Sequence, residues 1–124
     1  MITPFALLLA RCGLSHREAA SALGVRLDTV KSWASGRNGT PPAVLEELRT
    51  LYARIVRAAA EMLALIAEQA PDEVDLMLAP DDVTARERGW PAVGAQAAML
   101  GVVVAQCRRP MRIVEATAEQ DGLS

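Results

Sequence analysis

The chain of 124 residues carries 13 basic and 15 acidic side chains, and 52% of its residues are hydrophobic. This composition, rich in Ala, Leu and Val, excludes a disordered chain and indicates one compact helical unit or two small ones that share a core. The charge is uneven, because residues 1–57 carry eight basic and four acidic groups and residues 58–124 carry five and eleven. We therefore expect only the front half to contact a polyanion.

Two cysteines, Cys12 and Cys107, show neither metal-ligand spacing nor a disulfide framework, so reduced thiols are expected. The run FALLLARC has no basic residue before it, and Arg11 stands where a lipoprotein signal needs a small residue, so no such signal is expected. The apolar stretch 93–105 is too short and too interrupted to cross a membrane. We expect a cytoplasmic protein without a membrane partner.

The first predicted helix follows Thr3, a residue type that caps helices, and ends at Gly13. A second short helix is predicted after Ser15, because Ser15 and Glu18 have the spacing of a capping box. Gly24 then supplies a tight turn, for which a positive φ is expected.

A third short helix is predicted over residues 29–35, capped by Asp28 and ended by Gly36. Val30 and Trp33 lie three residues apart, so both are expected to face the core. The polar and charged side chains of this segment are then left for its outer face.

The run LSHREAASALGV, followed by TVKSWASGR and a proline, resembles the Cro/C1-type (XRE) helix-turn-helix family over residues 5–50. The marks of the resemblance are Ala20, Gly24, Val30, Trp33 and the Trp-x-x-Gly-Arg run. It implies a DNA-binding domain whose second helix enters the major groove. His16 departs from the family, which has Gln at this position, where the amide binds a phosphate and braces the recognition helix.

Within this resemblance, side chains that bond base edges or touch a thymine methyl are expected on the recognition helix. The predicted base contacts are Arg26, Leu27, Thr29, Lys31 and Ser32. The predicted phosphate contacts are Ser15 (through its backbone), His16, Arg17, Arg37 and Asn38. Three further arginines are expected to be solvated, namely Arg49, Arg54 and Arg57.

Apolar residues recur at three- and four-residue steps from residue 43 to about residue 69, which predicts a long helix that links the two halves. Segments 74–79 and 111–116 are predicted to be strands. Two helices are predicted between them, over residues 83–88 and from residue 90 to about residue 107. The back half is therefore β-α-α-β in outline, and residues from 117 on are expected to fray.

The predicted helix from residue 90 is apolar nearly all round, and about fifty residues cannot bury such a helix alone. We therefore expect it to pack against a second copy, with Gly94 and Gly101 allowing close approach. The predicted dimer interface consists of Trp90, Val93, Ala97, Leu100, Val103 and Val104.

The expected fold class is mainly α. A helix-turn-helix domain with a long closing helix is expected over residues 1–69, and a small α+β dimerisation domain over residues 70–124. This layout is similar to that of anti-CRISPR-associated autorepressors with a C-terminal dimerisation domain.

We expect no enzyme, cofactor or metal, because the acidic residues of segment 72–82 have no Cys or His partners at ligand spacing. The expected function is a transcriptional repressor of its own or a neighbouring promoter, acting as a homodimer on an inverted-repeat operator in double-stranded DNA. Three alternatives stay open: an antitoxin that also binds a toxin, a phage packaging subunit, and a protein-interaction module that has kept the fold. RNA as an additional target also stays open.

Overall fold

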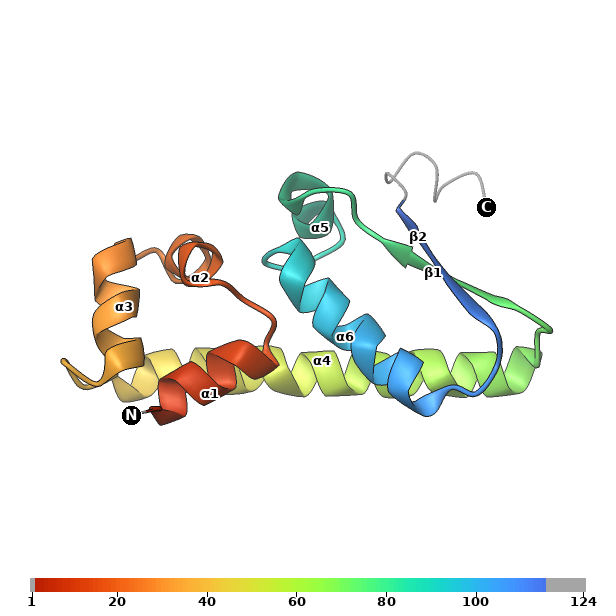
Figure 1. Cartoon of the computed structure of the whole chain (residues 1–124), viewed down its shortest axis with the longest axis horizontal. Coiled ribbons are helices and arrows are strands. Elements are labelled where there is room, and N and C mark those ends of the chain that lie inside the picture. Colours follow the sequence, from red (N-terminus) through yellow and green to blue (C-terminus); the bar gives the residue numbers. More distant parts are fainter. Residues whose placement is uncertain (1, 116–124) are drawn as a thin grey trace.

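The computed structural model describes residues 2–115, so the predicted frayed tail and the last residue of the second predicted strand lie outside the described residues. Within that range the chain is mainly helical, with six helices and one two-stranded parallel sheet. The longest element is α4 (Pro42–Gln69). In Figure 1 the earlier helices gather at one end of α4, and the later elements lie along its other end.

The front half consists of α1 (Pro4–Arg11), α2 (His16–Leu23) and α3 (Leu27–Ser35). The predicted N-caps of the first two helices are confirmed. The Ala6 N–H donates to the Thr3 hydroxyl oxygen at 3.1 Å, and Ser15 and Glu18 form a reciprocal capping box. Gly24 has a φ of 67°, which confirms that the turn between α2 and α3 uses the left-handed conformation.

The predicted start of α3 is wrong, because the helix begins at Leu27 and Asp28 is not its cap. Arg26 holds the N-cap position in extended backbone and makes no side-chain cap bond. The chain re-enters helical geometry as soon as it has left the turn at Gly24, so Asp28 falls in the first turn. Its carboxylate is favourable there because it faces the positive end of the helix dipole.

The core of the front half brings α1, α3 and α4 together. Val30 and Trp33 are buried as predicted, and the rings of Trp33 and Phe5 meet edge-to-face with centroids 5.6 Å apart. Cys12 is fully buried beside α4, where its thiol donates to the Leu48 carbonyl oxygen at 3.5 Å. Burial raises the pKa of the Cys12 thiol to about 11, so this group stays protonated and unreactive.

The back half is a parallel pair, β1 (Val74–Leu78) and β2 (Met111–Glu115), connected through α5 (Asp82–Glu87) and α6 (Val93–Gln106). Val74 lies opposite Met111, and Leu76 lies opposite Ile113. Val74 and Leu76 are buried on one face of the sheet. On the other face the Arg112 guanidinium donates to both carboxylate oxygens of Asp75, at 3.2 and 3.0 Å.

The sequence placed the start of α6 too early, because Trp90 and Pro91 belong to the loop before it. The Val93 N–H donates to the Asp82 carboxylate at 2.9 Å, which satisfies a donor at the first residue of the helix. The Trp90 N–H donates to the Ala85 carbonyl oxygen at 2.9 Å, so this residue closes the end of α5 instead.

The prediction that α6 needs a second copy for its burial is wrong for its main face. In the structure α4 packs along α6, and β1 contacts α6 as well. Trp90, Leu100 and Val103 lie in the core of the protomer, with Val103 fully buried, so they form no outer surface. Val93 is half-buried, and only Ala97 and Val104 of the predicted interface are exposed. The second half of α4 covers α6 in addition to the residues that follow α4, so the back half has more apolar surface for its core than those residues alone supply.

Gly94 makes a close contact within the chain. A Cβ on Gly94 would lie 2.0 Å from the Gly13 carbonyl oxygen, and a Cβ on Gly13 would lie 2.2 Å from the Gly94 carbonyl oxygen. The backbone of the α1–α2 turn therefore touches the first turn of α6. Gly101 differs, because a Cβ there would meet no atom of the described residues within 4 Å.

Arg54 also joins the halves, although the sequence placed it in solvent. Its guanidinium donates to the Gly89 carbonyl oxygen and lies 4.3 Å from the centroid of the Trp90 ring. Arg57 is exposed as predicted, and Arg49 is exposed in an ion pair with Glu46 on the same helix.

A matched pair of glycine variants tests the Gly13–Gly94 contact. Gly94→Ala is expected to lower the free energy of unfolding by about 1–3 kcal/mol, because the added methyl group forces two backbones apart. Gly101→Ala, in the same helix, is expected to raise it by up to about 1 kcal/mol, because alanine favours helix and meets open space. Urea unfolding followed by circular dichroism measures both, and an equal change in both variants would contradict the contact.

Candidate nucleic-acid interface

The core fixes which side of α3 faces outward. Because Val30 and Trp33 are buried, the opposite side of the helix presents Asp28, Lys31 and Ser35, all of which are exposed. Their spacing of three and four residues places them in one stripe along the helix. We call these three residues the outer stripe of α3.

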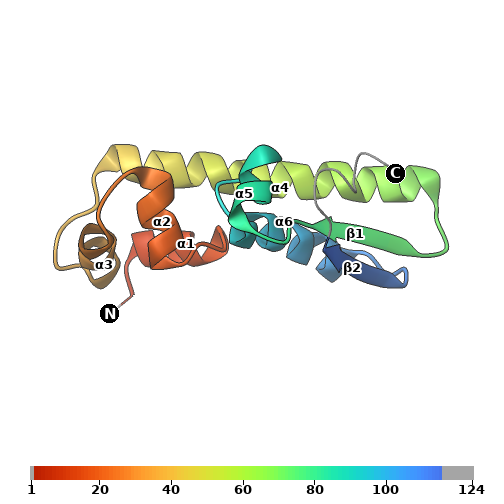
Figure 2. The same ribbon diagram turned by 90° about the horizontal axis from the view of Figure 1, so that it is seen from above.

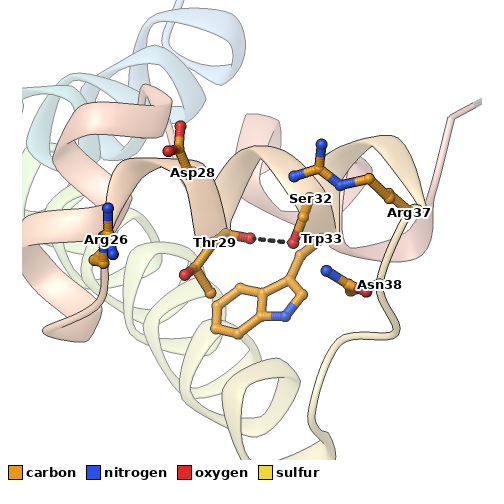
Figure 3. A pocket seen from close by; sticks show the side chains of 7 residues that line it. All are labelled: Arg26, Asp28, Thr29, Ser32, Trp33, Arg37 and Asn38. Carbon is orange, nitrogen blue, oxygen red and sulfur yellow. Dashed lines mark hydrogen bonds between the residues drawn. The ribbon is translucent and has the colours of Figure 1, made fainter.

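A depression of about 290 Å³ lies beside α3. Figure 3 shows Arg26 and Arg37 at its opposite ends, with Thr29 and Trp33 between them. Its lining residues are Arg26, Asp28, Thr29, Ser32, Trp33, Arg37 and Asn38. Two guanidinium groups and one carboxylate, that of Asp28, line this concave strip, so its charged groups are net positive by one.

The predicted base contacts divide into accessible and inaccessible side chains. Arg26 and Lys31 are exposed, and Leu27 and Thr29 are half-buried. The prediction for Ser32 is wrong, because Ser32 is only 3% exposed and its hydroxyl donates to the Thr29 carbonyl oxygen at 2.9 Å. The loop after α3 folds back at this point, where the Asn38 N–H donates to the Ser32 carbonyl oxygen at 3.3 Å.

The prediction that the Ser15 backbone binds a phosphate is also wrong. The Ser15 N–H already donates to the Glu18 carboxylate at 2.9 Å, and the Ser15 hydroxyl accepts from the Glu18 N–H at 3.1 Å. The capping box therefore occupies the Ser15 N–H, the backbone donor that the prediction assigned to a phosphate.

The other predicted phosphate contacts lie in two exposed pairs. His16 and Arg17 occupy the first turn of α2, and Arg37 and Asn38 lie in the loop that follows α3. The first pair therefore lies at the N-terminus of α2, and the second lies just after the C-terminus of α3. The Arg37 and Asn38 N–H groups are bonded within the chain, so this second pair offers its side chains.

Ser35 was not among the side chains predicted for the outer face, and Asp28 was predicted to be a cap. Both residues lie on the outer stripe of α3, beside Lys31. The helical period could have predicted that Ser35 lies on this stripe, because Ser35 follows Lys31 by four residues. The Ser35 hydroxyl donates to the Ser32 carbonyl oxygen at 3.2 Å and accepts from the Arg37 N–H at 3.3 Å. The capping role predicted for Asp28 assumed that α3 begins after it. The local sequence pattern did not predict the observed start at Leu27.

Comparison with protein-family models gives no match for this chain, and a search of curated proteins gives no significant match. Within residues 2–115, no cluster of three or more His, Cys, Asp or Glu side chains is placed to hold a metal ion. No helix in the same range has both the length and the apolar character that a membrane crossing needs.

The capping box can be tested by one substitution on α2. Ser15→Ala is expected to lower the free energy of unfolding by about 1 kcal/mol, because it leaves the Glu18 N–H without its acceptor. Ser21→Ala is the matched control, because Ser21 is exposed on the same helix and its hydroxyl bonds no group in residues 2–115. Chemical unfolding measures the difference, and equal stabilities of the two variants would contradict the capping role.

Proposed function

We propose that the protein is a sequence-specific DNA-binding transcriptional repressor, in which α2 and α3 form a helix-turn-helix and α3 enters the major groove. The observation that carries this proposal is the exposed outer stripe of α3, together with an exposed polar pair at the start of α2 and another just after α3. The inner side of α3 is held by Val30 and Trp33, so the helix presents its polar side as a fixed surface. A major groove about 12 Å wide admits one helix of this kind.

The residues around α3 suit the two kinds of DNA contact. Arg26 and Lys31 are exposed and can donate to guanine O6 and N7, while the half-buried Thr29 lines the depression together with Arg26. In this proposal the exposed pairs His16–Arg17 and Arg37–Asn38 contact phosphates on the walls of the groove.

The charge distribution supports contact through the front half. Residues 1–57 carry an excess of four basic groups, and residues 58–124 carry an excess of six acidic groups. Phosphates attract the first and repel the second, which orients the approach of the protein to DNA.

Repression in this proposal needs no chemistry beyond occupancy. A protein bound across a promoter blocks the polymerase, and a regulator that binds upstream of its own start codon limits its own synthesis. We propose two copies on an inverted repeat, with half-site centres separated by about 34–36 Å or a multiple of it.

Alanine substitutions at Arg26 and Lys31 test the reading surface. Each is expected to weaken binding to the DNA upstream of the start codon by about 5- to 150-fold, equivalent to roughly 1–3 kcal/mol, without a change in unfolding temperature. Arg57→Ala removes the same charge from an exposed position on α4 and is expected to change the affinity by less than about twofold. Gel-shift titration measures all three. No binding by the wild type, or an equal loss for Arg57→Ala, would overturn the proposal.

Asp28 offers a test in the opposite direction. Asp28→Asn removes a negative charge from the outer stripe and is expected to raise the affinity for unrelated DNA, because a carboxylate near phosphates is repelled. The ratio of operator affinity to unrelated-DNA affinity is expected to fall, because an asparagine amide selects the cytosine amino group less strictly than a carboxylate does. Glu47→Gln, at an exposed position on α4, is the control. Competition titrations at two salt concentrations measure the affinity for the operator and the affinity for unrelated DNA. Unchanged affinities would place Asp28 outside the interface.

A further inference from the structure

The sheet has two edges, and side chains of α6 cover one of them. The buried Gln96, only 5% exposed, reaches the outer edge of β1. Its side-chain N–H donates to the Met77 carbonyl oxygen at 3.2 Å, and its side-chain oxygen accepts from the Ala79 N–H at 2.8 Å. Gln96 thus bonds β1 as a neighbouring strand would.

The outer edge of β2 has no such cover within residues 2–115. The Val74 N–H donates to the Pro110 carbonyl oxygen at 2.9 Å, so the ladder uses the backbone groups of alternate residues. Arg112 and Val114 therefore turn their N–H and C=O groups toward β1. The same groups of Met111, Ile113 and Glu115 point away from β1. Figure 2 shows β2 on the side of β1 that is away from α4.

Ile113 makes this edge unusual for a surface. Its side chain is 49% exposed, although it is large and apolar. Exposed edges are normally protected by an outward lysine, a proline or a bulge, but the pairing with β1 runs unbroken over all of β2. The one cation of β2, Arg112, is held by Asp75 on the other face. A two-stranded sheet is also only marginally stable by itself.

We propose that a second copy of this chain covers the edge. In this arrangement β2 pairs antiparallel with β2 of the partner and forms a four-stranded sheet in the order β1-β2-β2-β1. The inference rests on the proposed function, because an inverted-repeat operator needs a protein with a two-fold axis. The axis then passes through the β2 edge and not through the α6 face that was expected from sequence.

The sequence of β2 suits pairing with itself. An axis centred on Ile113 places it opposite the partner's Ile113, which buries two exposed apolar side chains together. The same register places Met111 opposite the partner's Glu115 and Arg112 opposite the partner's Val114. All five residues of β2 are then paired, and no like charges lie opposite each other. The outward N–H and C=O of Ile113 also fall at the position where antiparallel strands exchange two bonds.

The segment after β2 is a poorer occupant of the edge. Residues 116–124 contain one large apolar side chain, Leu123, together with Glu119 and Asp121. Such a segment offers little apolar surface for Ile113. A second β2 supplies both the backbone partners and the matching isoleucine.

Two lysine variants separate this edge from the outer side of α6. Ile113→Lys is expected to raise the dimer dissociation constant by about tenfold or more, because two cations would then face each other across the axis. Val104→Lys is the matched control, because Val104 is 44% exposed on α6 and was part of the interface expected from sequence. It is expected to leave the dimer intact. Analytical ultracentrifugation without DNA measures both, with circular dichroism to confirm folding.

Disulfide cross-linking tests which residues of the two β2 strands lie opposite each other, and this test does not depend on the lysine variants. Arg112→Cys with Val114→Cys, in a Cys107→Ser background, is expected to give a covalent dimer on mild oxidation. Directly opposite residues outside the hydrogen-bonded pairs have Cα atoms about 4.5 Å apart, which a disulfide spans. Arg112→Cys alone, in the same background, is expected to give none, because its copy would lie two residues away. Cys12 does not interfere, because it is buried and protonated.

Three results would overturn the inference: a monomeric wild type, a dimer that Val104→Lys splits and Ile113→Lys does not, or a dimeric double-cysteine variant that fails to cross-link. Failure of the proposed function is a separate result, namely a wild type that binds no DNA whatever its oligomeric state. If both proposals hold, Ile113→Lys keeps the wild-type affinity for a single half-site and loses tight binding to the full inverted repeat.

Discussion

The apolar face of α4 is the constraint on which the rest of the structure depends. Its buried residues Leu48, Ile55, Ala59 and Ile66 follow one side of a 28-residue helix. The same helix contacts α1 in the front half and α6 in the back half, so neither half completes its core without it. The Gly13–Gly94 contact and the Arg54–Trp90 contact then join the halves at two further points.

Features set by neighbouring residues were predictable from the sequence. The Thr3 cap, the Ser15–Glu18 capping box and the turn at Gly24 each depend on a few consecutive residues, and the structure confirms all three. The burial of Val30 and Trp33 followed from their spacing on a short helix. The start of α6 did not follow, because it depends on the buried Trp90 ring and on an Asp82 carboxylate eleven residues away.

The candidate site shows the same division at the level of single side chains. Arg26, Lys31 and Arg37 are long and charged, so their exposure could be predicted from residue type. Ser32 and Ser15 could not be assigned in this way, because a hydroxyl or an N–H is available only if no nearby group has bonded it. The loop at Asn38 and the carboxylate of Glu18 decide those two cases.

The backbone contact between Gly13 and Gly94 has a consequence for DNA geometry. The two backbones touch, and α4 packs against both α1 and α6, so the front and back halves form one packed unit in which α3 and β2 have a set separation. In a symmetric dimer of this chain, the two reading helices would then have one separation and one relative rotation. Each base pair inserted between the half-sites turns one of them by about 34–36° around the duplex. A rigid protein cannot follow that rotation, so spacer length would distinguish operators as strictly as base sequence does.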